Sequence, residues 1–225
     1  MSSLVIPLLI IIGFFTFQSK DESTSPKTFE NANQEKVYLM SHRSLEEKAK
    51  LSINENQDYK KIYKFITQKY NKKDKEEAKL MTHYIVKFSQ DNKLDPKLAA
   101  ALIARESSFK KNAVSKTGAK GLGQIKDFNF KDLKINNPFN IKENINGTVT
   151  YLKKMKKKWD KKHEKLNQIR ENNADKKKDD DIYWALASYY KGFTAVKKTN
   201  GYLDNQTRNY IKDIYNNYEE IKKID

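Results

Sequence analysis

The sequence predicts an all-α or nearly all-α fold, and two observations carry this prediction. Apolar residues recur three and four positions apart through most of the chain after Tyr59, which is the spacing of one helix face. No stretch alternates apolar and polar residues for long enough to indicate a strand. Short strands stay open only for residues 115–125, where turn residues replace the helical period.

Two helices are expected first, one from Tyr59 to about residue 70 and one from about Asp74 to about residue 88. Each has one apolar stripe at helical spacing, which favours packing over a functional site. The stripes consist of Ile62, Phe65 and Ile66 in the first helix, and Met81, Tyr84, Ile85 and Phe88 in the second.

A third helix is expected from about Pro96 to about Ser107, because Asp95 is a good N-cap and proline fits the first helical turn. Helical spacing places Glu106 on the same face as three apolar residues, Ala99, Leu102 and Ile103. Glu106 is therefore expected to point toward the core.

Glu106 is the candidate catalytic acid. Desolvation and the negative end of the helix dipole both disfavour its charged form, so its pKa is expected to be raised. A carboxyl group that is still protonated near neutral pH can protonate a leaving-group oxygen. The alternative is a structural ion pair between Glu106 and Arg105 or another basic residue.

The segment after Phe109 is rich in turn residues and contains the run Gly121–Gln124. Glycine allows a backbone to approach a sugar closely, so this loop is expected to form a wall of a saccharide groove. The alternative is an irregular connection that contributes Leu122 and Ile125 to the core.

Three further helices are expected: one beginning near Lys142, one over residues 182–190 and one over about 205–223. Between the first two, a charged segment of about residues 156–181 is interpreted as an inserted extended helix and solvated loop without a catalytic part. A sharper hypothesis makes this segment an arm that binds a partner or the cell wall.

The N-terminus divides into an apolar segment, residues 1–19, and a polar tether, residues 20–57, before a domain of residues 58–225. The apolar run Leu4–Phe17 is shorter than the roughly 20 residues that span a membrane, and it fits a signal peptide in length. No small-x-small cleavage site follows it, which favours an uncleaved membrane anchor over a removed signal.

Composition excludes some chemistry. The chain has no cysteine, and its three histidines lack the spacing of metal ligands, so neither a disulfide nor a metal site is expected. The net charge of +16 suits an anionic cell wall or membrane surface as well as a nucleic acid. Its lysines are scattered and not interleaved with stacking aromatics, so no nucleic-acid partner is expected.

Several ordered blocks resemble the SLT-type lytic transglycosylases, which are lysozyme-like enzymes related to goose-type lysozyme. The blocks are Ala104–Phe109, Ala113–Ser115 with Gly118 and Ala119, Gly121–Ile125, Asn144 with Tyr151 and Leu152, Leu186–Tyr189 with Gly192, and Thr207–Ile211. The resemblance covers roughly residues 80–218. It implies a helical lysozyme-like domain with a saccharide-binding groove.

The resemblance implies cleavage of the β-1,4 bond between N-acetylmuramic acid and N-acetylglucosamine in peptidoglycan, with 1,6-anhydro ends and no cofactor. Glu106 would be the catalytic residue. The substrate side would be formed by Ser107, Gly121, Leu122, Gln124, Tyr189 and Tyr210. The partners would be peptidoglycan glycan strands, with envelope machinery as a further option. The location would be extracytoplasmic, periplasmic or on the outer face of the inner membrane.

The chain departs from the family pattern at four points. Gly123 stands where a methionine is usual, Asp127 replaces a proline, and Tyr190 replaces an asparagine that would contact an N-acetyl group. The family's glycine between Asn144 and Tyr151 stands one position early, as Gly147. These departures leave two alternatives open: a hydrolytic lysozyme in which Asp127 activates water, and a catalytically weak peptidoglycan-binding module.

Overall fold

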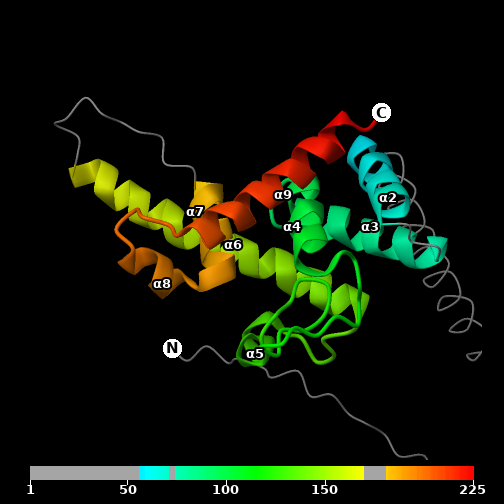
Figure 1. Ribbon diagram of the computed structural model, residues 1–225, viewed down its shortest axis with the longest axis horizontal. Helices are drawn as coiled ribbons and strands as arrows, with labels where there is room; N and C mark the ends of the chain where they lie inside the picture. The colour runs from blue at the N-terminus through cyan, green and yellow to red at the C-terminus, as the bar shows by residue number, and fades with distance from the viewer. Residues whose placement is uncertain (1–55, 71–73, 170–180) are drawn as a thin grey trace, which may run out of the picture. The chain divides into compact units, whose positions relative to one another are not determined.

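Helix α4 (Pro96–Ser107), which carries Glu106, packs most extensively against α9 (Asn205–Lys223), as Figure 1 shows. The structure is a computed structural model that describes residues 56–70, 74–169 and 181–225. These residues fall within a single unit, Glu46–Asp225. The apolar N-terminal segment and most of the tether therefore lie outside the described residues.

The described residues form helices joined by loops. Besides α4, these are α2 (Gln57–Lys69), α3 (Lys75–Asp91), η1 (Asp127–Asn129), α5 (Phe130–Leu133), α6 (Ile141–Ile169), α7 (Asp181–Lys191), α8 (Phe193–Lys198) and α9 (Asn205–Lys223). Residues 113–125 contain only isolated bridges, Val114 to Lys120 and Lys120 to Ile125. The prediction of an all-α fold is confirmed, while the three short helices η1, α5 and α8 were not expected.

The starts of the helices follow the capping residues in the sequence. The side chain of Asp95 accepts a hydrogen bond from the backbone N–H of Lys97 at 2.9 Å, and Pro96 occupies the first turn of α4. Asp204 caps α9 in the same way, through the backbone N–H of Thr207 at 2.7 Å. Such caps satisfy N–H groups that have no partner inside the helix, which explains why the helices begin where they do.

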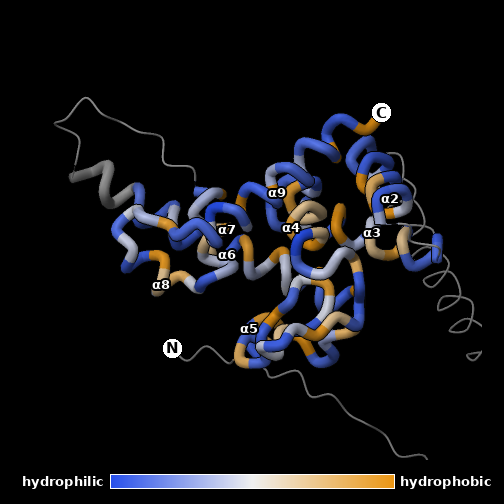
Figure 2. The backbone as a smooth tube through the Cα atoms, viewed as in Figure 1, coloured by the Kyte–Doolittle hydropathy of each residue, from blue (hydrophilic) through white to orange (hydrophobic). Residues whose placement is uncertain are grey.

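The core gathers on α4, whose small side chains let its neighbours approach closely. Ala99, Ala100 and Ala101 are almost completely buried, and α9 contributes Ile211 and Ile214 to the same core. In Figure 2 the tube of α4 is coloured mostly toward the hydrophobic end of the scale, whereas much of the remaining tube is hydrophilic. The carboxyl-terminal end of α4 is thereby held rigidly inside the domain.

Helix α6 continues without a break through the first part of the expected insertion. Trp159 is buried, and its indole N–H donates a hydrogen bond to the hydroxyl of Ser188 on α7 at 2.8 Å. His163 is also buried, with its Nδ1 2.5 Å from a carboxylate oxygen of Asp181. This part of α6 is therefore core, and the loop expected after it lies outside the described residues.

Within the described residues, no helix combines the length and the apolar character that crossing a membrane requires.

Candidate active site

The chain reverses direction immediately after Glu106. Ser108 and Phe109 both adopt left-handed backbone conformations, with φ values of 52° and 59°, which cost about 1–3 kcal/mol each in non-glycine residues. The side chain of Phe109 is fully buried, with its ring centroid 6.3 Å from that of Phe65 and 5.2 Å from that of Tyr70. This packing holds the strained reversal in place beside the acid.

Glu106 is half-buried near the end of α4, and its carboxyl group is held by Tyr210 from α9. The Tyr210 hydroxyl donates a hydrogen bond to Oε1 of Glu106 at 2.5 Å. Burial raises the pKa of Glu106 from 4.5 to about 7, while the bond from Tyr210 and the charge of Arg105 act to lower it. The desolvated carboxyl group can therefore carry a proton near neutral pH.

Arg105 is not an ion-pair partner of Glu106. Its Nε lies 2.9 Å from a carboxylate oxygen of Asp213 on α9, and its guanidinium carbon lies 5.3 Å from the centroid of the Tyr210 ring. The structural ion pair considered from the sequence is thus formed elsewhere. Arg105 instead lies against the tyrosine that holds the acid.

The glycine loop is fastened to α6 by Asn144, a fully buried side chain. Asn144 accepts a hydrogen bond from the backbone N–H of Gly123 at 2.8 Å, and its amide donates to the carbonyls of Pro138 at 2.8 Å and Lys120 at 3.2 Å. Because these bonds satisfy backbone groups on two sides, Asn144 fixes the course of the loop.

Tyr189 holds the same loop from α7. Its hydroxyl donates to the backbone carbonyl of Gly123 at 2.7 Å, and its ring meets that of Tyr151 edge to face at 5.1 Å. Burial, followed by the negative charge of Glu106, raises the pKa of Tyr189 well above 10. Burial likewise raises the pKa of Tyr210, so both hydroxyls remain donors around the acid.

Two glycines of the loop are required by close approach. A Cβ atom on Gly121 would lie 2.2 Å from the Asn144 amide nitrogen and 2.2 Å from the carbonyl oxygen of Pro138. A Cβ atom on Gly123 would lie 1.8 Å from the hydroxyl oxygen of Thr148. A larger residue at either position would require its neighbours to move, either on α6 or in the loop just before α6.

A hollow of about 240 Å³ adjoins this cluster. Gln124 and Tyr189 line it together with Phe128, whose side chain is 81% exposed, and Tyr190. Tyr190 stacks on Tyr210 with 4.5 Å between the ring centroids. The hollow is thus connected to Glu106 through two stacked tyrosines, and exposed aromatic faces are suited to sugar rings.

The structure places two predicted site residues, Tyr189 and Tyr210, near Glu106 and two, Gly121 and Gln124, on the glycine loop. Tyr210 bonds to it, Tyr189 lies within its electrostatic reach, and Gly121 and Gln124 belong to the loop that Tyr189 holds. Two predicted residues are turned into the domain. Leu122 is 1% exposed, and Ser107 is 7% exposed with its hydroxyl donated to the carbonyl of Ile103.

Sequence reasoning missed two supporting residues. Thr148 occupies the space beside Gly123 and donates its hydroxyl to the carbonyl of Asn144 at 2.8 Å. Phe128 is an exposed aromatic on η1. Phe128 follows the glycine loop directly, and an aromatic residue in a polar segment is a signal that points to this surface.

The part of the chain that the structure describes contains no set of side chains that could bind a metal ion. No three side chains of histidine, cysteine, aspartate or glutamate gather there in a way that could hold an ion. Asp127, which was considered as a base, is exposed and pairs with Lys120 at 2.8 Å.

A model of the transglycosylase SLT domain matches residues 83–212, which is more than half of the chain. The chain belongs to the transglycosylase SLT domain family. The match includes Glu106, the glycine loop and both tyrosines of the site, so the resemblance found in the sequence is confirmed. In this SLT family member, the matched residues 83–212 run from within α3 to within α9.

Two solved structures are also similar to this SLT family member. An inactive mutant of the lytic transglycosylase Slt from Pseudomonas aeruginosa has 17% sequence identity and a TM-score of 0.47, over 62% of this chain and 23% of that one. The 70 kDa soluble lytic transglycosylase from Escherichia coli has 18% identity and a TM-score of 0.46, over 83% and 34%. The SLT family member thus spans about a quarter to a third of their lengths.

Proposed function

We propose that this chain is a peptidoglycan lytic transglycosylase that cleaves the β-1,4 bond between N-acetylmuramic acid and N-acetylglucosamine and leaves 1,6-anhydro ends. The observation that carries the proposal is the desolvated carboxyl group of Glu106, with a pKa of about 7. Membership of the SLT family supplies the substrate class. The glycine loop and the adjoining hollow supply room for a glycan beside the acid.

In the first step, protonated Glu106 gives its proton to the glycosidic oxygen as the bond from that oxygen to C1 of the muramic acid breaks. A general acid works best when its pKa lies near the operating pH, and about 7 satisfies this condition. Tyr210 stabilises the carboxylate that the transfer produces, because its hydroxyl donates to Oε1.

In the second step, the Glu106 carboxylate takes the proton of the 6-hydroxyl of the same muramic acid, and O6 bonds to C1. The acid returns to its protonated form, and no water is consumed. Mechanisms with a protein nucleophile or a protein base need a second carboxyl group across the scissile bond. Asp127, the alternative base, is exposed and paired with Lys120 at 2.8 Å.

The test of catalysis is Glu106→Gln, measured by turbidity clearance of purified sacculi. The amide preserves the shape of the side chain and lacks the transferable proton, so we expect a folded protein with no clearance. Glu219→Gln is the matched control, since Glu219 is exposed at the far end of α9 and pairs only with Lys222 among the described residues. Clearance by folded Glu106→Gln would contradict the assignment of the acid.

The product distinguishes transglycosylation from hydrolysis. Anhydro ends are lighter than reducing ends by one water, so mass spectrometry of released muropeptides separates the two reactions. We expect predominantly anhydro ends, unchanged in Asp127→Asn. Reducing ends that disappear in Asp127→Asn would make the protein a hydrolytic lysozyme.

The location follows from the substrate. Peptidoglycan lies outside the cytoplasmic membrane, so the proposal requires export to the cell envelope. The apolar run Leu4–Phe17 is the candidate anchor or signal, as interpreted from the sequence. Sequencing the N-terminus of the mature protein distinguishes the two, since a start near residue 20 means a cleaved signal.

A further inference from the structure

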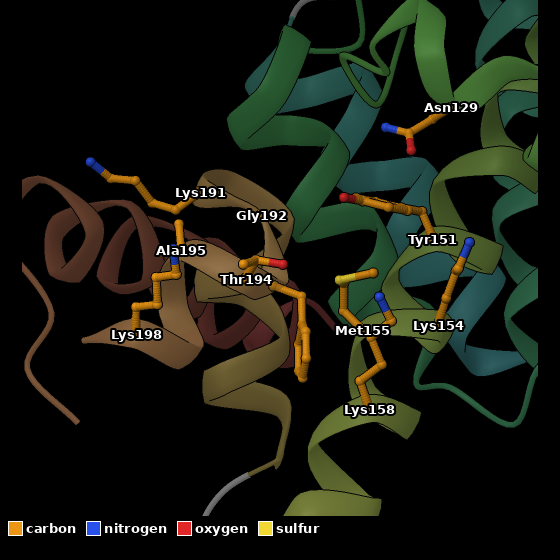
Figure 3. A pocket seen from close by; sticks show the side chains of 11 residues that line it. Asn129, Tyr151, Lys154, Met155, Lys158, Lys191, Gly192, Thr194, Ala195 and Lys198 are labelled. Carbon is orange, nitrogen blue, oxygen red and sulfur yellow. The ribbon is translucent and has the colours of Figure 1, made fainter. Parts of the chain in front are cut away.

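A larger hollow, of about 580 Å³, lies between α6 on one side and the end of α7 with α8 on the other. Its lining includes four lysines, and Figure 3 shows that they come from both sides: Lys154 and Lys158 from α6, and Lys191 from the end of α7 with Lys198 from the end of α8. Among the residues that the structure describes, none that lines the hollow is acidic. It will be called the lysine hollow.

The lysine hollow adjoins the hollow beside the active site. The two share Asn129, Tyr151, Lys191 and Gly192 among their lining residues. A ligand whose glycan lies beside Gln124 and Tyr190 can therefore extend into the lysine hollow without leaving the surface of the same domain.

The lysines are available to a ligand. Within the described residues, neither Lys158 nor Lys198 forms an ion pair, and the ammonium of Lys158 lies 4.8 Å from the ring centroid of Phe193. Lys154 is 3.3 Å from Asp132 and Lys191 is 3.0 Å from Asp204, and in both pairs the two side chains are exposed. Exposed pairs of this kind contribute little, so an anionic ligand can compete for both lysines.

The remaining lining is partly apolar. Tyr151 and Phe193 are half-buried aromatics, and Met155 is buried beneath them. Ammonium groups on flexible stems act as separate point charges and suit carboxylates that are spread along a chain. The combination fits a short peptide with several carboxylates and apolar side chains better than a uniformly charged polymer.

We propose that the lysine hollow binds the acidic stem peptide that the muramic acid lactyl group carries. The proposal rests on the proposed function, because the peptide reaches the hollow only if its glycan lies in the neighbouring groove. It makes Lys158 and Lys198 determinants of substrate preference, with no part in proton transfer.

The experiment compares two substrates, peptide-bearing glycan strands and strands stripped of peptide by an amidase. The double variant Lys158→Gln/Lys198→Gln is tested against Lys157→Gln/Lys197→Gln, which removes two exposed lysines from the same helices outside the hollow. On peptide-bearing strands we expect KM to rise about three- to tenfold in the first variant, from two exposed charge contacts, and kcat to stay unchanged. Stripped strands should show no change, and the control variant should behave as the parent protein.

An equal rise in KM on both substrates, or no rise on either, overturns the proposal. A parent protein that cleaves both substrates with the same KM overturns it too, while leaving the proposed function intact. If the parent cleaves neither substrate, the proposed function fails, and the hollow is judged by calorimetry with a soluble stem tetrapeptide. Binding lost in Lys158→Gln/Lys198→Gln supports the peptide site, whereas binding of a glycerol phosphate polymer without binding of the peptide overturns it.

Discussion

Gly123 and Thr148 should behave as a size-matched pair of residues that sets the geometry of the active site. Gly123 does not have a positive φ, so its backbone would accept a side chain. The obstacle is Thr148, because an added Cβ would lie 1.8 Å from its hydroxyl oxygen, 2.8 Å from its Cβ and 2.9 Å from its Cγ2. Rotating the threonine about its Cα–Cβ bond moves the hydroxyl oxygen and Cγ2 but leaves the 2.8 Å contact with its Cβ, so the loop or α6 must shift.

The magnitude follows from these distances. Overpacking of this kind costs about 1–3 kcal/mol, which we expect for Gly123→Ala. Thr148→Gly alone should cost about 0.3 kcal/mol from helix propensity, and more from its lost hydrogen bond to Asn144. The double variant should lose less stability than the sum of the two single variants, with a coupling of about 1–2 kcal/mol. Thr148→Gly removes the clash that Gly123→Ala creates, and the alanine in turn fills part of the space that the threonine leaves.

Urea unfolding of the four proteins gives the coupling, and cleavage of sacculi gives its functional counterpart. Activity should follow stability, since both backbone groups of Gly123 are bonded to Asn144 and Tyr189 at the site. Thr150→Gly is the matched control, as it makes the same change two residues further along α6. Additivity of Gly123→Ala and Thr148→Gly within about 0.5 kcal/mol, as expected for the control pair, would refute the reasoning.

Three further predictions concern the acid and its surroundings. Because the pKa of Glu106 is about 7, kcat/KM should be constant at lower pH and fall about tenfold per pH unit above 7, as a pH–rate profile will show. The free energy of unfolding should also fall by roughly 3 kcal/mol as pH rises from about 4.5 to 7, because Glu106 binds its proton more tightly in the folded state than in the unfolded chain. Unfolding measurements on Glu106→Gln should lack this decrease. Tyr210→Phe removes a bond that lowers the pKa of Glu106, so the alkaline limb of the profile should move upward by up to about one pH unit, and a limb that moves downward contradicts this role.

Local signals explain why the main helices were predictable. Asp74, Asp95 and Asp204 cap α3, α4 and α9, and the apolar period continues from each cap to the end of its helix. The inward position of Glu106 follows from the same period. The six residues of α8 are too few for a periodic pattern, so no reading of spacing could have found that helix.

The parts of the site that join distant segments could not be predicted. Arg105 pairs with Asp213, and Asn144 reaches back to Gly123, because tertiary packing brings these residues together. The lysine hollow has the same origin, since it joins residues of α6 to residues of α7 and α8. In the sequence these lysines were indistinguishable from the many others in a chain of net charge +16.

Two departures from the family pattern, at positions 123 and 148, lie in contact with each other. The pattern places a methionine at 123 and a glycine one position after Gly147, whereas this chain has the small residue at 123 and threonine at 148. In this chain the side chain of Thr148 occupies the space between the glycine loop and α6. Thr148 therefore supports the loop at the point where the carbonyl of Gly123 accepts the hydrogen bond from Tyr189. Because an added Cβ at position 123 would meet Thr148, the small residue at 123 and the threonine at 148 fit each other.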